Sequence, residues 1–148
     1  MNKEKIIQLL HEELFLLNKS LDVLNYSLEN CKKIGIKPEY NMLELSEFES
    51  LSSRFARSSD ILTQKVLKTL FIYMQEEAKF FIDRCNLSEK IGLVDAADDL
   101  YNIRKLRNDI SHEYCITDIT EIFEPLLQYS SLLLDIVDNT KSYIEENI

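Results

Sequence analysis

The sequence predicts an all-α protein, folded as an antiparallel up-and-down bundle of four to five helices in a single domain of residues 1–148. The 148 residues include only two Gly and two Pro, whereas strands and tight turns normally need more of both. Long segments carry apolar residues at steps of three and four, the period of an amphipathic helix. The chain is long enough for one domain with a core, and too short for two comfortable ones.

The first helix is expected from about Lys3 to Lys33. One face of this segment is apolar: Ile6, Leu9, Leu10, Leu14, Leu17, Leu21, Leu24 and Leu28. Gly35 can adopt the left-handed conformation that follows a helix C-terminus, and Pro38 prevents the helix from continuing.

A second helix is expected from about Leu43 to Met74, with a polar insert at residues 52–60 in its middle. The insert holds Arg54, Arg57 and Asp60 among small Ser and Ala residues, which would let another backbone approach closely. Arg54 and Arg57 share a face because they are three residues apart. The insert is either a solvated face or a basic ledge beside a cleft.

Residues 75–94 have a less regular pattern, and we expect a loop with short helical turns, one of them capped by Ser88 and broken by Gly92. A third main helix should begin at Asp95. Asp98 and Asp99 in its first turn complement the helix dipole. Its core stripe consists of Leu100, Ile103, Leu106 and Ile110.

The last helical region is expected from Ile119 to about Glu146. Asp118 and Glu121 have the spacing of a capping box. Pro125 is poorly tolerated inside a helix, so two arrangements are open. Either the helix kinks near Ile122, or a short turn precedes a new helix that has Pro125 in its first turn.

The composition limits the classes of function. There are 17 Lys plus Arg against 26 Asp plus Glu, a formal charge of −9, which argues against general adhesion to nucleic acid or anionic membranes. No apolar run approaches the roughly 20 residues that span a bilayer, so no membrane association is expected. Cys31, Cys85 and Cys115 are odd in number, widely spaced and not preceded by a secretory signal. We expect reduced thiols in a cytoplasmic protein, and neither a metal site nor a cofactor.

Residues able to do chemistry are concentrated between Leu106 and Tyr114, where Arg107, His112 and Tyr114 form an Arg-x4-His-x-Tyr pattern. Arg107 carries a fixed positive charge, and the imidazole of His112 can exchange protons near neutral pH. A cation, a proton shuttle and a phenol within so few residues suggest a site for a phosphate-bearing substrate.

Helical geometry restricts how Arg107 and His112 can cooperate. With about 100° per residue, Arg107 lies roughly 40° from the core direction, and His112 lies roughly 140° further round and about 7.5 Å along the axis. The two side chains cannot converge on one atom of a straight helix. Either the helix unwinds near Ser111, or two copies of the motif face each other across a two-fold dimer interface.

A purely structural interpretation is also open. In that case His112 caps the helix C-terminus, Arg107 forms a salt bridge to Asp109 or Asp60, and Tyr114 packs on the edge of the bundle. His11, which is followed by Glu12 and Glu13 on the first helix, is expected at the surface.

The motif resembles that of the HEPN family, whose hallmark is Arg-x4-6-His near the end of a helix in a small helical bundle. With Tyr114 added, it is similar to the HepT-type branch, the toxins of HEPN/MNT toxin–antitoxin pairs (type VII-like). The helix order and chain length extend this resemblance over most of residues 1–148.

The resemblance implies a metal-independent endoribonuclease that acts as a homodimer, with Arg107 and His112 of both chains as catalytic residues at a shared cleft. Asn108, Asp109 and Ser111 would support them, and we infer separately that Arg54 and Arg57 guide RNA. The implied partner is a minimal nucleotidyltransferase antitoxin that attaches AMP to Tyr114. The added negative charge would then exclude RNA phosphate.

Two other functions compete with a ribonuclease. The first is a non-catalytic subunit that presents a nucleotide or substrate to a separate nucleotidyltransferase, which the charge of −9 favours because a free ribonuclease benefits from a positive field. The second is a structural helical adaptor, which burial of Arg107 and His112 in fixed salt bridges away from any cleft would support.

Overall fold

A computed structural model describes residues 2–112 and 118–148 of the chain, and within these ranges it contains helices and no strand. The main helices are α1 (Lys3–Ile34), α2 (Met42–Ile61), α3 (Leu67–Tyr73), α4 (Phe81–Lys90), α5 (Ala97–Ser111) and α6 (Phe123–Asn147). A π-helical stretch, η1 (Leu62–Val66), joins α2 to α3, and a 3₁₀-helix, η3 (Ile119–Ile122), precedes α6. The predicted all-α bundle is confirmed.

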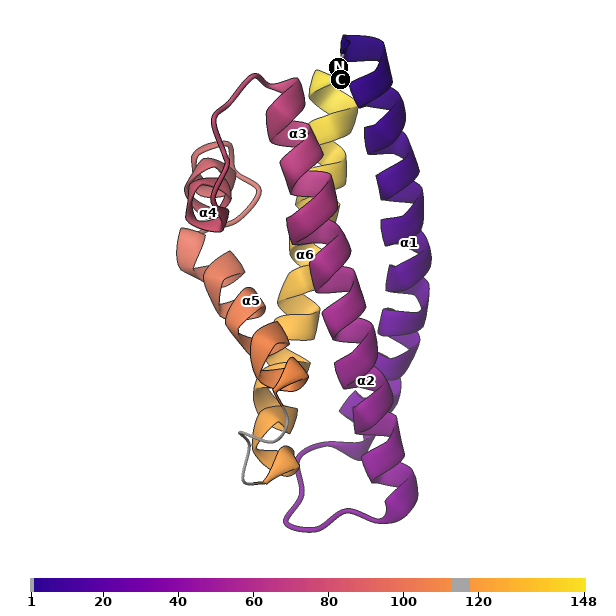
Figure 1. The fold of residues 1–148 in the computed structure, drawn as a ribbon. Coiled ribbons are helices and arrows are strands. Elements are labelled where there is room, and N and C mark those ends of the chain that lie inside the picture. The colour runs from indigo at the N-terminus through magenta and orange to yellow at the C-terminus, as the bar shows by residue number, and fades with distance from the viewer. Residues whose placement is uncertain (1, 113–117) are drawn as a thin grey trace.

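The long helices alternate in direction (Figure 1). α1 and α5 run away from the end of the bundle where both termini lie, whereas the α2–η1–α3 rod and α6 run back toward it. α4 is short and lies at one side, between the end of α3 and the start of α5. α1 and α5 are at opposite sides of the bundle, with the other long helices between them.

α1 begins where the Asn2 side chain accepts a hydrogen bond from the Lys5 N–H at 2.9 Å. It ends at Gly35, whose φ of 73° and N–H bond to the Cys31 carbonyl match the predicted stop. The expected apolar stripe is buried except at its margins: Leu14 is only partly buried, and Leu9 is 36% exposed. Leu9 and Leu10 are neighbours whose side chains point about 100° apart, and Leu10 is the one that is fully buried.

The second helix was expected as one uninterrupted α-helix, and it is a continuous rod with a π-helical stretch inside. Asn41 and Glu44 form a reciprocal capping box at its start. In η1 the Leu67 N–H donates to the Leu62 carbonyl, five residues back. A π-turn accommodates about one extra residue per turn, so it changes the direction of the side chains that follow it. Asp60 lies just before this change.

Residues 75–94 are more regular than expected, because α4 is a helix of ten residues. The Asp83 carboxylate accepts from the Phe80 N–H at 3.2 Å and caps the start of α4. Ser88, predicted as a cap, lies inside α4 and is buried, so that prediction is wrong. Gly92 follows α4 with a φ of 84°, as a helix breaker should.

α5 begins two residues later than expected, and the Glu89 carboxylate of α4 accepts from its Ala97 N–H at 2.8 Å. At the other end of the chain, the second arrangement for Pro125 is correct: η3 precedes a new helix in which Pro125 is the third residue. Asp118 caps η3 by accepting from the Thr120 N–H at 3.0 Å and from its hydroxyl at 2.8 Å.

The core runs along the bundle and is closed by an aromatic cluster at the α1–α2 loop. The rings of Phe48 and Phe123 stack at 4.0 Å, and Tyr40 meets both edge-on. Cys31 and Cys85 are free thiols inside the core, and burial raises their pKa values to about 12 and about 11. Cys115 lies outside the described residues. In the described part of the chain, no helix is both long and apolar enough to cross a membrane.

Candidate functional site

The polar insert of α2 meets α5 through one carboxylate. The Arg107 guanidinium donates to both oxygens of Asp60, from Nε to Oδ1 at 2.6 Å and from Nη2 to Oδ2 at 2.7 Å. Arg104, one turn earlier, donates from Nη1 to Oδ1 at 2.8 Å. Two parallel N–H···O bonds fix the plane of a guanidinium as well as its position, and a single bond does not. Asp60 therefore holds Arg107 rigidly and Arg104 more loosely.

Arg107 has a further contact, because its Nη1 donates to the hydroxyl of Ser111, the last residue of α5. The guanidinium thus lies between α2 and the C-terminal turn of α5. We call Asp60, Arg104, Arg107 and Ser111 the Asp60 cluster.

The electrostatics of the cluster follow from these contacts. Burial opposes ionisation of the Asp60 carboxyl, but hydrogen bonding from Arg107 and the charges of both arginines outweigh it and lower its pKa. The hydrogen bond to Asp60 in turn raises the pKa of Arg107, against the effect of burial. At neutral pH the cluster contains two cations and one anion, so it retains a net positive charge.

The cluster is partly open to solvent. The Arg107 side chain is 24% exposed, and the Asp60 side chain is 37% exposed. Arg107 is therefore held in a salt bridge, as the structural interpretation expected, but it is not sealed in the core. Asp60, rather than Asp109, is the carboxylate that binds it.

α5 ends directly after Ser111. His112 is the C-cap, with φ −111° and ψ 52°, and its N–H still donates to the carbonyls of Asn108 and Asp109 at 3.1 Å. The end of α5 is therefore where the first of the two predicted arrangements places it, and equally where the structural interpretation, with His112 as the cap of the helix, places it. His112 is exposed at this end of the bundle. Tyr114, the third residue of the motif, lies outside the described residues.

Two hollows flank α5 beside the cluster. One, of about 410 Å³, lies where α2 approaches the end of α5 and the start of α6. Its lining combines small and apolar side chains with one carboxylate: Glu49, Ser52, Ser53, Ala56, Ile110, Ile119, Ile122 and Phe123. The other, of about 460 Å³, lies between α4 and α5, and Arg104, Lys105, Asn108 and Asp109 are among its lining residues. In the sequence of α5, Arg107 lies between residues that line these hollows: Arg104 and Lys105 before it, and Asn108, Asp109 and Ile110 after it.

The other predicted site residues are placed differently. Asn108 and Asp109 are exposed on α5, next to the cluster. Arg54 donates from Nη1 to the Ser27 hydroxyl at 2.6 Å and to the Val23 carbonyl at 3.3 Å, so it ties α2 to α1. Arg57 is exposed. The two arginines that were expected to share a ledge therefore have different surroundings.

Arg104 was not singled out in the sequence, although it belongs to the cluster. Its spacing of three residues from Arg107 places both on one side of the helix, and this spacing is the signal that could have identified it. Within residues 2–112 and 118–148, no group of three or more His, Cys, Asp or Glu side chains is arranged to hold a metal ion.

No protein-family model, curated protein or solved structure matches the chain.

Proposed function

We propose that this protein is a metal-independent endoribonuclease of the HEPN type, the toxin of a type VII-like toxin–antitoxin pair. One observation carries the proposal beyond the motif. The Arg107 guanidinium is oriented by two hydrogen bonds that it donates to Asp60 and by a contact with Ser111, and the residue after Ser111 is the exposed His112, at which α5 ends. A pre-oriented cation and an exposed histidine at the same helix end are the two kinds of group that phosphodiester transfer needs.

In the proposed reaction, His112 takes the proton of an RNA 2′-hydroxyl, and the 2′-oxygen attacks the adjacent phosphorus. The bond from phosphorus to the 5′-oxygen breaks, and His112 passes the proton that it has taken to that oxygen. The products are a 2′,3′-cyclic phosphate and a 5′-hydroxyl end. Arg107 stabilises the extra charge on the phosphate oxygens in the transition state, by exchanging the Ser111 hydroxyl for a phosphate oxygen at Nη1.

The neighbouring residues have secondary roles in this proposal. Arg104 binds Asp60 through one nitrogen only, so its remaining N–H groups can attract the substrate. Asn108 and Asp109 border the same end of α5 and would bind the nucleotide next to the cleaved bond. Arg57 is exposed on α2 and would contact the RNA backbone further away.

Control of the activity is part of the same proposal. A minimal nucleotidyltransferase would transfer AMP from ATP to the hydroxyl of Tyr114, two residues after His112, and release pyrophosphate. The phosphate so added is negatively charged and would repel the RNA phosphate from Arg107. Mass spectrometry of the chain purified with such a partner and ATP would detect an AMP adduct on wild type and none on Tyr114→Phe.

The experiment that tests the ribonuclease is cleavage of single-stranded RNA in the presence of EDTA. Wild type should cut, and His112→Ala should lose at least about a hundredfold in rate, since a general acid–base group typically contributes that much. His11→Ala is the matched control, because His11 is the other histidine of the chain and lies on the exposed side of α1. Equal rates for wild type and His112→Ala would refute the proposal.

A second candidate function is a nucleotide-binding subunit without catalysis. The formal charge of −9 favours it, and so does the partial neutralisation of the two arginines by Asp60. It predicts that a nucleotide binds and that RNA stays intact at every pH between about 5 and 9, the range in which histidine titrates. The cleavage assay at several pH values decides between the two functions.

A further inference from the structure

The outward face of α1 exposes large apolar side chains. Five of them are more than a third exposed: Leu9 (36%), Phe15 (60%), Leu16 (46%), Val23 (39%) and Tyr26 (65%). Single exposed apolar residues are common on protein surfaces, but a contiguous group on one helix marks an interaction surface.

Four of these residues, all except Phe15, follow a regular spacing. Leu9, Leu16 and Val23 are seven residues apart, and Glu12, Lys19 and Tyr26 fall between and after them at steps of three and four. We call these six residues the α1 stripe. Steps of alternately three and four residues are the a/d pattern by which two helices pack along a common seam.

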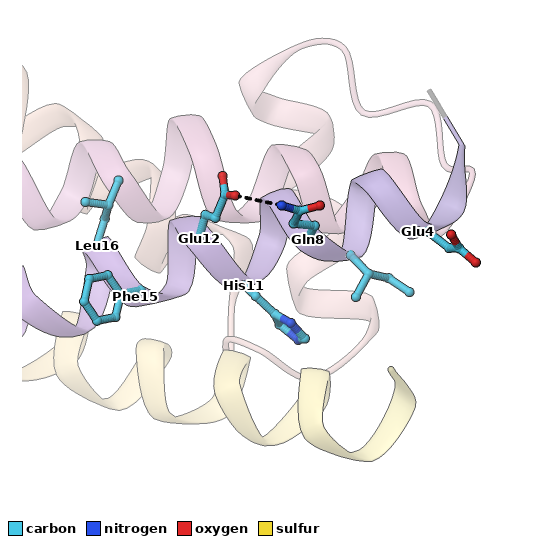
Figure 2. A pocket seen from close by; sticks show the side chains of 7 residues that line it. Glu4, Gln8, His11, Glu12, Phe15 and Leu16 are labelled. Atoms are coloured by element: carbon cyan, nitrogen blue, oxygen red, sulfur yellow. Dashed lines mark hydrogen bonds between the residues drawn. The ribbon is translucent and has the colours of Figure 1, made fainter.

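The stripe runs beside α2: Arg54 of α2 donates to the Val23 carbonyl at 3.3 Å, and the stripe is most exposed at Leu16 (46%) and Tyr26 (65%). The buried side of α1 packs on α2, α3 and α6 through a different set of residues, among them Leu10, Leu17 and Leu24. The surface hollow on the outer side is lined by α1 residues alone: Glu4, Ile7, Gln8, His11, Glu12, Phe15 and Leu16. Figure 2 shows Glu12 and Leu16 projecting from one side of the helix, and Gln8 donating to Glu12 at 3.3 Å. A hollow made by one helix is half of a groove that a second helix can complete.

The charges of Glu12 and Lys19 decide in which orientation a second α1 helix can pack on the stripe. If two copies of α1 packed in parallel, Glu12 would meet Glu12 and Lys19 would meet Lys19, which is repulsive. In an antiparallel pair centred between residues 17 and 18, Glu12 of each copy faces Val23 of the other and Lys19 faces Leu16. Glu12 and Lys19 of the two copies are then offset along the helix axis by four residues, about 6 Å, which their long side chains can span. Leu9 then faces Tyr26. The stripe is therefore complementary to itself in the antiparallel orientation.

We propose that the α1 stripe binds the α1 stripe of a second copy of this chain in an antiparallel, two-fold symmetric interface. The ammonium of Lys19 already lies 4.7 Å from the centroid of the Phe15 ring. It can thus cover apolar surface with its stem and reach Glu12 of the second copy with its charge.

The α1 interface does not use the residues of the proposed ribonuclease site. α1 and α5 lie on opposite sides of the bundle (Figure 1), so a dimer formed through α1 leaves both Asp60 clusters on its outer sides. This interface differs from a dimer in which two α5 motifs face each other, as the HEPN resemblance implies.

Charge exchange in the full chain tests the interface. Sedimentation equilibrium should find a dimer for wild type. Glu12→Lys and Lys19→Glu should each weaken the dimer by about tenfold or more, because each replaces two attractive pairs by two repulsive ones. An equimolar mixture of the two variants should restore the dimer, and so should the double variant that carries both substitutions in one chain.

Asp138→Lys is the matched control, since Asp138 is exposed on α6 and outside the stripe. It should dimerise as wild type does. Circular dichroism of every variant checks that the fold is retained, and a misfolded single variant would be replaced by Glu12→Gln or Lys19→Gln. A wild-type monomer at all concentrations, single variants that dimerise like wild type, or a mixture that stays dissociated would each overturn the proposal.

Discussion

The charged side chains of the Asp60 cluster, on the α5 side of the bundle, are held by another helix, whereas those of the α1 stripe are not. On the α5 side, Arg104 and Arg107 share the carboxylate of Asp60, which belongs to another helix, and their geometry is fixed by the fold. On the α1 side, Glu12 and Lys19 are exposed among large apolar side chains, and they bind within their own helix or stack on it. The difference separates two tasks: a fixed cation suits a small charged substrate, and an exposed apolar stripe suits another protein surface.

The largest expected effect on stability distinguishes a buried residue of α1 from an exposed neighbour on the same helix. Leu16 and Leu17 are neighbours, but Leu16 is 46% exposed and Leu17 is fully buried. Leu17→Ala should lower the free energy of unfolding by about 2–5 kcal/mol, because it removes buried methyl groups and leaves a cavity. Leu16→Ala should change it by less than about 0.5 kcal/mol under dissociating conditions. Urea unfolding of dilute protein compares the two.

If both variants lost the same stability at low concentration, the outer side of α1 would be packed inside the monomer. The distinction between the two sides of the bundle would then be wrong. Unequal losses that become similar as the protein concentration rises would instead show that Leu16 contributes through association.

The next largest effect is the loss of stability in Asp60→Asn, which should depend on pH. Asp60→Asn should cost about 1–2 kcal/mol at pH 7, the lower part of the range for paired charges, since more than a third of the side chain is exposed and water screens it. The pKa of Asp60 is lowered in the folded state, so its contribution is complete above the unfolded value of about 3.9 and is lost as the pH falls through the folded value.

The stability difference between wild type and Asp60→Asn should therefore be constant from pH 7 to about pH 5, and then shrink at lower pH. Urea unfolding at several pH values measures it. A difference that stays the same down to pH 3 would mean that the ionised carboxylate is not what holds the two arginines.

A smaller effect should distinguish the two arginines of the cluster. Arg107→Lys loses a two-bond contact that an ammonium cannot reproduce, and we expect a cost of about 1 kcal/mol. Arg104→Lys keeps a charge near Asp60 and loses only one bond, so its cost should be about half as large or less. Thermal unfolding of the two variants side by side makes the comparison. Equal costs would contradict the different roles assigned to them.

The sequence predicts much of the fold because helix period and end signals are local. The first helix begins at Lys3 as expected, and Gly35 ends it as expected. Leu9 shows the limit of this reasoning. It belongs to an apolar segment, but whether it faces the core or a second molecule depends on where the other helices lie, and a period of three and four residues permits both.

The candidate site also depends on contacts between helices, which local sequence signals do not determine. The motif could be located on the third main helix, and Asp60 and Asp109 were both possible partners for Arg107. The choice depends on how α2 packs against α5, and on a π-turn beside Asp60 that no residue in the insert signals. Arg104 lies outside the Arg-x4-His-x-Tyr pattern, which begins at Arg107, so the motif does not identify it, although a spacing of three residues places both arginines on one side of the helix.

The smallest effect tests whether the arginines of α2 belong to the structure or to RNA binding. Arg54 donates to Ser27 and Val23 of α1, so Arg54→Ala should cost about 0.5–1 kcal/mol of stability. Arg57 is exposed, and Arg57→Ala should leave the stability unchanged while weakening RNA binding and reducing its dependence on salt. Thermal unfolding measures the first quantity, and fluorescence anisotropy with labelled RNA at several salt concentrations measures the second. Loss of RNA binding in Arg54→Ala alone, with Arg57→Ala unaffected, would place the RNA on the α1 side of α2 and away from the Asp60 cluster.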